Sequence, residues 1–372
     1  MGYYARVAIT NPGPSPVLEI VTGRFSSFIG GVGASMYTKR HLQYYEQLEL
    51  LKSRGLAIDD EQFCLAALRT IGYFRLSGYV YPLRKPKLEA ERTTRFNYRY
   101  DEMKPGHALD EAVRLAYFDR QLRLKILHGV DIIETALKAL IAQLAGEVNL
   151  FIHVREDLLD EKACNVPVTI RGETYTQFEV WMQRYGLLVG QAKHEDFIQH
   201  HFSQYGGDLP IWVAVEILDF GAVSLLFKLL PKRVKSKISQ EVGVSNGQIL
   251  DVWLKVIGYA RNVCAHFSRM WNRTLTYKIG KPNPNTVGPC IHHLGEIDGD
   301  HLSKVYALLA VIAYMISFIE PDSRWRVHVC EQVKKMPRIV GISPELSMGF
   351  PADWQTMDLW SHKAKIVNGS TL

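Results

Sequence analysis

The best candidates for chemistry in this chain lie close together in residues 259–273, which read Tyr-Ala-Arg-Asn-Val-Cys-Ala-His-Phe-Ser-Arg-Met-Trp-Asn-Arg. The imidazole of His266 can take up and release a proton near neutral pH. The guanidinium of Arg261 can bind a phosphate through charge-assisted hydrogen bonds. Together they offer two kinds of group that cleavage of a phosphodiester requires, a proton carrier and a cation.

We expect this segment to form one α-helix. Val263, Phe267 and Met270 recur at three- and four-residue intervals, so they would share one buried side. The polar residues would then share a second stripe: Asn262, His266, Arg269 and Arg273. The alternative is a helix with a solvated basic face and one structural histidine.

Several basic residues are candidates for contacts with RNA phosphates. Arg269 and Arg273 can extend the phosphate track beyond His266. Lys232 and Arg233 belong to the densest basic cluster, for which the alternative is the solvated end of a helix.

An aromatic, glycine-punctuated stretch, residues 72–84, supplies one further candidate, Arg75. Its tyrosines can stack on unpaired bases while the arginine holds a phosphate. The alternative is a packed turn in which the tyrosines close a core. Residues 84–104 follow as a basic loop or short hairpin.

Cysteine and histidine spacing argues against a metal site. The five cysteines are scattered without a paired spacing, which favours a reducing cytoplasm over a disulfide framework or a zinc cage. Two small groups would need further ligands before they could hold a metal: His194, His200 and His201, and Cys290, His292 and His293. We therefore expect neither a metal nor a cofactor.

The composition is that of a globular protein. Apolar residues make up 47% of the 372 residues, which is ample for a sizeable core. A formal charge of +6 is modest for this length, so the total does not by itself indicate a nucleic-acid-binding protein. The most apolar run, residues 305–319, is shorter than the roughly 20 residues that cross a bilayer. We interpret it as a central core helix and expect no membrane contact.

We divide the chain into four regions by its patterning. They are a poorly ordered N-terminal extension (residues 1–35), an N-terminal helical subdomain with a basic segment (36–104), a helical domain (105–335) and a C-terminal tail (336–372). The tail is expected to pack through Trp354 and Trp360.

Residues 108–145 have the pattern of a long amphipathic helix. Gly129 inside it can mark a bend, so two consecutive helices are an alternative. Arg123 and His128 in this pattern repeat the spacing of the arginine and histidine described above. We attribute that repeat to chance, because both residues lie in an ordinary charged amphipathic helix.

Capping signals mark other helix starts. Asp59 with Gln62, and Ser245 with Gln248, have the spacing of a capping box. Other stretches have their own predicted elements: a brief strand at residues 166–170, a helix at 178–188, and a buried helix from Pro210 that continues to residue 230.

Several stretches together resemble the AbiD/AbiF group of bacterial abortive-infection proteins, over about residues 38–320. They are residues 71–79 (Ile-Gly-Tyr-Phe-Arg-Leu-Ser-Gly-Tyr), 118–123 (Phe-Asp-Arg-Gln-Leu-Arg), 209–212 (Leu-Pro-Ile-Trp), 261–266 (Arg-Asn-Val-Cys-Ala-His) and 271–273 (Trp-Asn-Arg). That family resembles the HEPN superfamily, whose ribonucleases carry an arginine, a polar residue and, after a short gap, a histidine. Arg261, Asn262 and His266 match this pattern position by position.

The resemblance implies an all-α fold, an HEPN-like helical bundle with an additional N-terminal helical subdomain. It also implies a cytoplasmic phage-defence protein that arrests growth, with an RNA substrate, a homodimer that brings two motifs together, and an antitoxin or regulatory RNA as a further partner.

The implied activity is a metal-independent endoribonuclease in which the 2′-hydroxyl of RNA attacks phosphorus. His266 would act as general acid or base, Arg261 would clamp the phosphate and Asn262 would position one of them. A two-fold dimer would supply a second histidine. The alternative is a non-catalytic module on the same fold that binds RNA or protein and senses infection.

Overall fold

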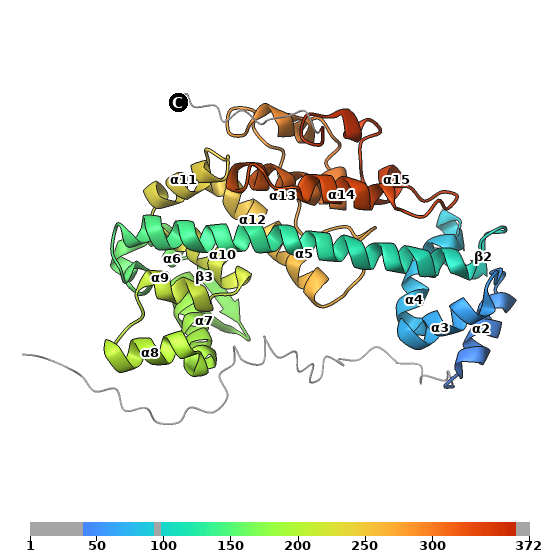
Figure 1. Cartoon of the computed structure of the whole chain (residues 1–372), viewed down its shortest axis with the longest axis horizontal. Coiled ribbons are helices and arrows are strands. Elements are labelled where there is room, and N and C mark those ends of the chain that lie inside the picture. Colours follow the sequence, from blue (N-terminus) through green and yellow to red (C-terminus); the bar gives the residue numbers. More distant parts are fainter. Residues whose placement is uncertain (1–39, 93–97, 362–372) are drawn as a thin grey trace, which may run out of the picture.

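Helix α5 (Leu109–Gly146) is the axis of the molecule, and other helices pack along it (Figure 1). The computed structural model describes residues 40–92 and 98–361, and the expected N-terminal extension, residues 1–35, lies outside this part of the chain. The described chain is predominantly helical, with two small antiparallel sheets. The predicted all-α class is therefore confirmed.

Over its 38 residues, all of them described, α5 is one continuous helix without the break considered at Gly129. A Cβ atom at this position would lie 2.7 Å from Cγ2 of Ile312 and 2.7 Å from Cε2 of Trp325. These residues belong to α13 (Val305–Ile319) and α14 (Trp325–Lys334). Glycine is needed here because the two helices approach the backbone of α5, not because the helix bends.

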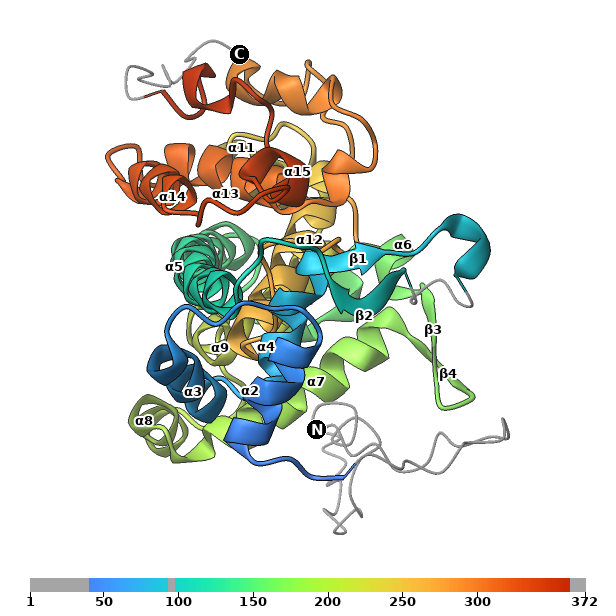
Figure 2. The same ribbon diagram turned by 90° about the vertical axis from the view of Figure 1, so that its right-hand side faces the viewer.

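The helices form layers around α5, as the view in Figure 2 shows. Helices α13 and α14 lie on one side of α5, and α9 (Ile211–Ala214) lies on the other. Helix α12 (Gly247–Ala265) contacts both α5 and α13 and so connects the layers.

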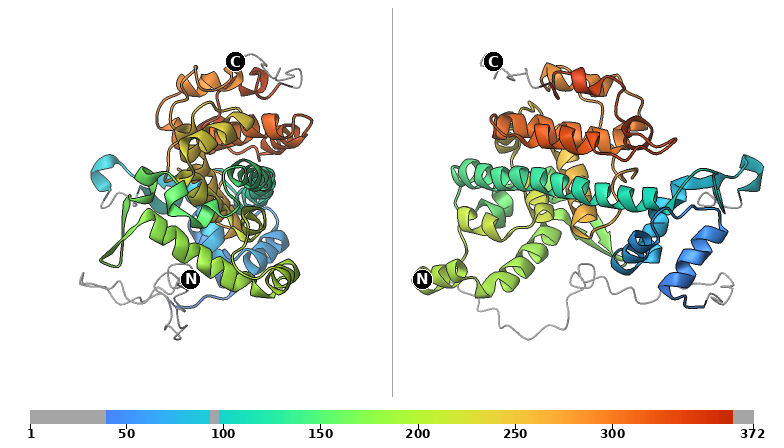
Figure 3. Two further views of the ribbon diagram at one scale, coloured as in Figure 1. Left: turned by 90° about the vertical axis from the view of Figure 1, so that its left-hand side faces the viewer. Right: turned by 45° about the vertical axis from the view of Figure 1, so that its right-hand side comes forward.

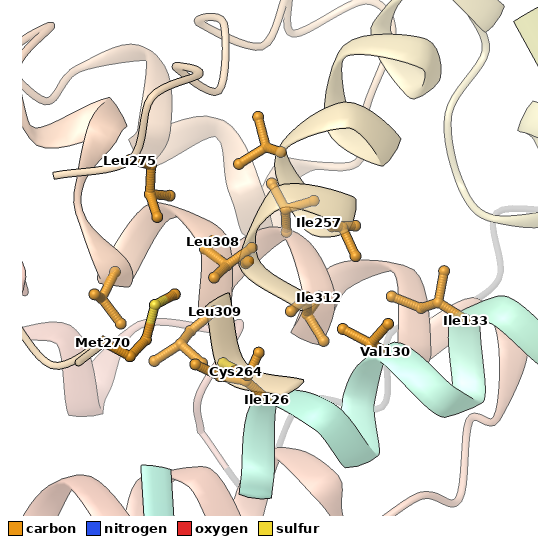
Figure 4. Packing of buried hydrophobic residues seen from close by; sticks show 14 of the residues in the cluster. Ile126, Val130, Ile133, Ile257, Cys264, Met270, Leu275, Leu308, Leu309 and Ile312 are labelled. Atoms are coloured by element: carbon orange, nitrogen blue, oxygen red, sulfur yellow. The ribbon is translucent and has the colours of Figure 1, made fainter. Parts of the chain in front are cut away.

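Helices α5, α12 and α13 share a central apolar core (Figure 4). Its labelled members are all buried: Ile126, Val130, Ile133, Ile257, Cys264, Met270, Leu275, Leu308, Leu309 and Ile312. Residues 305–316 of α13 are each at most 1% exposed, which confirms the predicted core helix. Among the described helices, none combines the length and the apolar character needed to pass through a bilayer.

The N-terminal helices pack at one end of α5, where Figure 3 shows them in blue. The elements of this part are α2 (Tyr44–Ser53), α3 (Glu61–Thr70), α4 (Tyr73–Val80), β1 (Arg84–Pro86) and β2 (Arg99–Met103). The two strands pair antiparallel, so the stretch predicted as a loop or short hairpin is a hairpin.

In two helices the N-cap is the residue that follows the predicted one, so each helix begins one residue later than predicted. Asp60, not Asp59, caps α3, and its carboxylate accepts a backbone N–H at 2.9 Å. Asn246, not Ser245, caps α12 through a hydrogen bond of 2.8 Å. The hydroxyl of Ser245 instead donates to the carbonyl of Thr286 at 3.4 Å.

The segment after α5 contains short elements, shown in green in Figure 1. They are α6 (Glu161–Cys164), β3 (Pro167–Ile170), β4 (Glu173–Thr176), α7 (Gln177–Gln191) and α8 (Asp196–Gln204). Strand β3 and helix α7 confirm the predicted strand and helix in this region.

The single buried helix predicted for residues 210–230 is wrong, because the chain forms two helices there. Helix α9 ends at Ala214, a 3₁₀ turn follows, and α10 (Phe220–Leu229) starts anew. The carboxylate of Asp219 accepts the N–H of Ala222 at 2.8 Å. An aspartate that captures a backbone N–H in this way starts a helix and does not continue one.

Beyond α11 (Lys232–Glu241) and α12, the chain closes with an aromatic cluster over α13. Trp354 and Trp360 are buried, as expected of the tail, with their ring centroids 5.9 Å apart. The ring centroids of Tyr306, in α13, and Phe350 are 4.8 Å apart. The described tail, including α15 (Pro344–Met348), therefore belongs to the packed structure.

Candidate functional site at the end of helix α12

Helix α12 ends immediately after the candidate residues. Its last helical residue is Ala265 and His266 is its C-cap. Phe267 then adopts a left-handed conformation with φ of +56°. Its N–H donates to the carbonyl of Cys264 at 3.0 Å, and the N–H of Ser268 donates to that of Val263 at 2.9 Å. These two bonds form a Schellman motif, which normally places glycine at the left-handed position.

This ending corrects the prediction of one helix over residues 259–273. Phe267 is 62% exposed and does not join the buried side with Val263 and Met270. Met270 is buried, but it reaches the core from the loop after the helix. A left-handed non-glycine residue costs about 1–2 kcal/mol, so tertiary contacts must hold the chain in this turn.

The structure brings Arg261, Asn262 and His266 to this one helix end. Arg261 is half-buried, whereas Asn262 and His266 are exposed. The guanidinium of Arg261 donates from Nη1 to Oδ1 of Asn262 at 3.2 Å. Within the described chain, no hydrogen bond engages the imidazole of His266. The imidazole is therefore accessible to a ligand or a second protein molecule.

An ion pair that sequence reasoning missed lies beside Arg261. Nη2 of Arg184, on α7, donates to both carboxylate oxygens of Asp219 at 2.7 and 2.5 Å. Burial alone would raise the pKa of Asp219, but the hydrogen bonds it accepts and the charges of Arg184 and Arg261 outweigh burial and lower that pKa. Asp219 is therefore ionised at neutral pH.

Close packing of α12 on α10 places this ion pair near Arg261. Gly258 faces Phe220, and a Cβ atom at Gly258 would lie 3.1 Å from Cδ1 of that ring. Phe220 directly follows Asp219, so the glycine allows the start of α10 to approach the last turns of α12. Recognising Asp219 as a helix cap would have been the available sequence signal.

A buried carboxylate holds the loop that follows His266. Asp119 of α5 is fully buried and accepts the backbone N–H groups of Met270 at 3.1 Å and Trp271 at 2.7 Å. It also accepts the hydroxyl of Tyr79 at 2.7 Å and pairs with the buried guanidinium of Arg123. Arg123 is therefore part of the buried core and not of an exposed charged face, whereas His128 is exposed.

Arg269 and Arg273 lie in this loop and not on a helical stripe with His266. Arg269 donates from Nη1 to the carbonyl of Gly78 in α4, and burial lowers its pKa. Arg273 donates to the carbonyl of Arg269 at 2.8 Å and to the hydroxyl of Tyr259 at 3.1 Å. Both arginines therefore tie the loop to α4 and α12.

The other predicted RNA-binding residues lie apart from this helix end. Arg75 is exposed on α4. Lys232 and Arg233 are exposed on α11, and Lys232 lines a cavity together with Gly247 at the opposite end of α12. A helix of 19 residues separates its ends by roughly 28 Å. Lys232 and Arg233 therefore do not form one cluster with His266.

Within the described residues, no three histidine, cysteine or acidic side chains gather in a way that could hold a metal ion. His293 and His292 are engaged singly, by the hydroxyl of Tyr306 at 2.7 Å and by the carbonyl of Val287 at 3.1 Å. The chemistry available at the end of α12 is thus that of an imidazole, a guanidinium and an amide.

Comparison with known proteins identifies the family. A family model described as Abi-like protein matches residues 66–272, more than half of the chain. Neither a curated protein nor a solved structure matches this chain. The matched range includes α5, Asp119 and all three residues at the end of α12. The chain therefore belongs to the family of Abi-like proteins.

Proposed function

We propose that this protein is an abortive-infection effector that cleaves RNA with Arg261, Asn262 and His266. Membership of the Abi-like family points to abortive infection, a defence against phage. The observation that carries the proposed activity is an exposed imidazole at a helix end that also carries a guanidinium. The match to the arginine, polar residue and histidine of HEPN ribonucleases supports the same assignment.

The chemistry follows from what RNA cleavage requires. The 2′-hydroxyl attacks phosphorus, so a base must take its proton and an acid must protonate the departing 5′-oxygen. His266 carries one of these protons, and Arg261 stabilises the charge on the phosphate oxygens. Asn262 accepts a hydrogen bond from Arg261 and so restricts where the guanidinium lies.

The neighbouring ion pair keeps Arg261 available for a phosphate. An unpaired carboxylate at Asp219 would compete with the phosphate for the guanidinium of Arg261. Arg184 already neutralises that carboxylate through two hydrogen bonds. The local charge that remains next to the exposed imidazole is therefore positive, as binding of an RNA backbone requires.

A homodimer completes the proposed site. One histidine cannot easily act at both the attacking and the departing oxygen, and a two-fold interface repeats the same surface on both partners. Two copies of the α12 end would supply two imidazoles and two guanidinium groups. Phe267, exposed directly beside His266, offers an aromatic surface for the partner or for an RNA base.

The direct test is cleavage of total RNA by the purified full chain in the presence of EDTA. We expect products with 2′,3′-cyclic phosphate ends, and a rate lowered about 100-fold or more in His266→Ala, the scale of a lost general acid or base. His128→Ala is the matched control, since His128 is exposed and follows Arg123 at the same spacing. An unchanged rate in His266→Ala would refute the mechanism, and RNA retention without cleavage would identify a binding module.

A further inference from the structure

An open cavity of about 510 Å³ lies between the N-terminal half of α5 and the end of α14 with its following loop. Arg114 and Tyr117 line it from α5, and Lys335 and Arg338 line it from the opposite side. Its volume is within the range of roughly 300–1,000 Å³ that is usual for small-molecule sites. The proposed ribonuclease chemistry uses none of these residues.

Three cationic side chains around this cavity have no ion-pair partner among the described residues. Arg114, Lys335 and Arg338 are exposed, and none forms an ion pair with another described residue. Glu111 is the carboxylate in the lining, and it is already engaged by Nδ1 of His107 at 2.7 Å. With three cations against one carboxylate the lining has a net positive charge, and a concave surface with such an excess attracts a ligand of the opposite sign. The cavity is therefore suited to an anion.

The loop that carries Arg338 is held in place by its own turn. Ile339 and Ile342 are buried, and the N–H of Ile342 donates to the carbonyl of Ile339 at 3.0 Å. Gly341 has a φ of +75°, which a side-chain-bearing residue rarely adopts. These contacts fix the backbone next to Arg338, so binding would not have to order the loop.

The remaining lining suits an aromatic base. Gln332 is 6% exposed, and its Nε2 donates to the carbonyl of Phe118 at 3.2 Å, which fixes a polar amide in the lining. Tyr117, Phe118 and Ile339 add apolar surface around this amide. An apolar surface with a few fixed polar groups is the usual composition of a site for a heterocyclic ligand.

We propose that this cavity binds a nucleoside phosphate. The phosphate would lie on Arg114, Lys335 and Arg338, where guanidinium and ammonium groups provide charge-assisted hydrogen bonds. The base would lie against the apolar side, next to the amide of Gln332. This site shares no residue with the proposed RNA-cleaving site at the end of α12, so the two proposals can be tested independently.

Calorimetric titration of the full chain with ADP, GDP and inorganic phosphate at low salt tests the site. We expect at least one nucleotide to bind, with a Kd that rises about tenfold or more in Lys335→Glu and in Arg338→Glu, since each removes a charged hydrogen-bond donor. Lys334→Glu is the matched control: Lys334 is the exposed neighbour outside the cavity, and its substitution should change the Kd less than about twofold.

Four results would overturn the proposal. They are no binding of either nucleotide to the folded wild-type chain, an equal effect of Lys334→Glu and Lys335→Glu, binding of inorganic phosphate as tight as that of the nucleotides, and binding of a single-stranded RNA oligomer at these residues in place of both nucleotides. Circular dichroism of each variant separates a lost site from a lost fold.

Discussion

Asp119 accepts the backbone N–H of Trp271 at 2.7 Å, although 152 residues separate them in the sequence. Trp271 lies five residues beyond His266, so a carboxylate in the N-terminal third of α5 holds the chain that leaves the candidate site. Because Asp119 is fully buried, its charge must be matched by the donors around it. The same carboxylate therefore links the core to the position of the imidazole.

Asp119→Asn is expected to destabilise the protein by about 3–5 kcal/mol, because it leaves the buried guanidinium of Arg123 without its partner. Urea unfolding followed by circular dichroism measures this. The control is Asp131→Asn, an exposed aspartate on the same helix, which should change the free energy of unfolding by less than about 0.5 kcal/mol. Equal effects would show that Asp119 is not the anchor we describe.

Gly129→Ala is expected to lower the free energy of unfolding by about 1–3 kcal/mol, since the new methyl group would collide with Trp325 and Ile312. Gly186→Ala in α7 should instead raise it by about 0.5–1 kcal/mol, because nothing lies within 4 Å of that position and alanine favours a helix. Thermal and urea unfolding of the two variants and the wild type measure these changes. Two changes of the same sign would contradict the close approach at Gly129.

Phe267→Gly is expected to be more stable than Phe267→Ala by about 1 kcal/mol, because both lose the exposed ring but only glycine adopts a φ of +56° without strain. Differential scanning calorimetry of the pair measures the difference. If alanine is equally stable, the left-handed turn after His266 is not maintained in solution.

His153 makes stability dependent on pH. Burial lowers the pKa of this histidine to about 4 from its ordinary value near 6.5, so it is neutral in the folded protein. The unfolded chain takes up a proton as the pH falls through about 6.5, whereas the folded chain does so only near 4. The contribution of His153 to the free energy of unfolding is therefore complete above about pH 6.5 and declines toward pH 4. At pH 5 it is smaller by about 2 kcal/mol.

Urea unfolding between pH 5 and pH 7 measures this decline, and His153→Phe should make it smaller because no imidazole remains to be protonated. His194→Phe, at an exposed histidine, is the control and should leave the pH dependence as it is in the wild type. A wild-type slope retained in His153→Phe would assign the effect to other groups.

If the site is shared between two subunits, an inactive chain should abolish the activity of a wild-type chain with which it pairs. Unfolding and refolding the wild type with a threefold excess of His266→Ala should reduce the ribonuclease activity to about one quarter, if subunits pair at random and mixed dimers are inactive. Refolding with the same excess of an unrelated protein is the control. Activity that follows the amount of wild-type chain alone would show that each subunit works by itself.

Much of the architecture follows from local patterns in the sequence. The apolar run at residues 305–319 predicts the core helix, and the spacing of apolar residues predicts the length of α5 to within a residue or two. Arg261, Asn262 and His266 are recognisable as a candidate site because they lie within six consecutive residues. Periodicity and short spacing suffice here, since neighbours in the sequence are also neighbours on a helix.

The tertiary structure alone decides what surrounds that site. The helix ends at Ala265, with His266 as its C-cap, because Phe267 turns left-handed and Asp119, which is far away in the sequence, accepts N–H groups of the backbone that follows. Asp219 and Arg184 reach Arg261 from two other helices, through a contact that Gly258 permits. A sequence pattern records which residues share a helix face, but a buried charge finds its partners only when distant segments pack together.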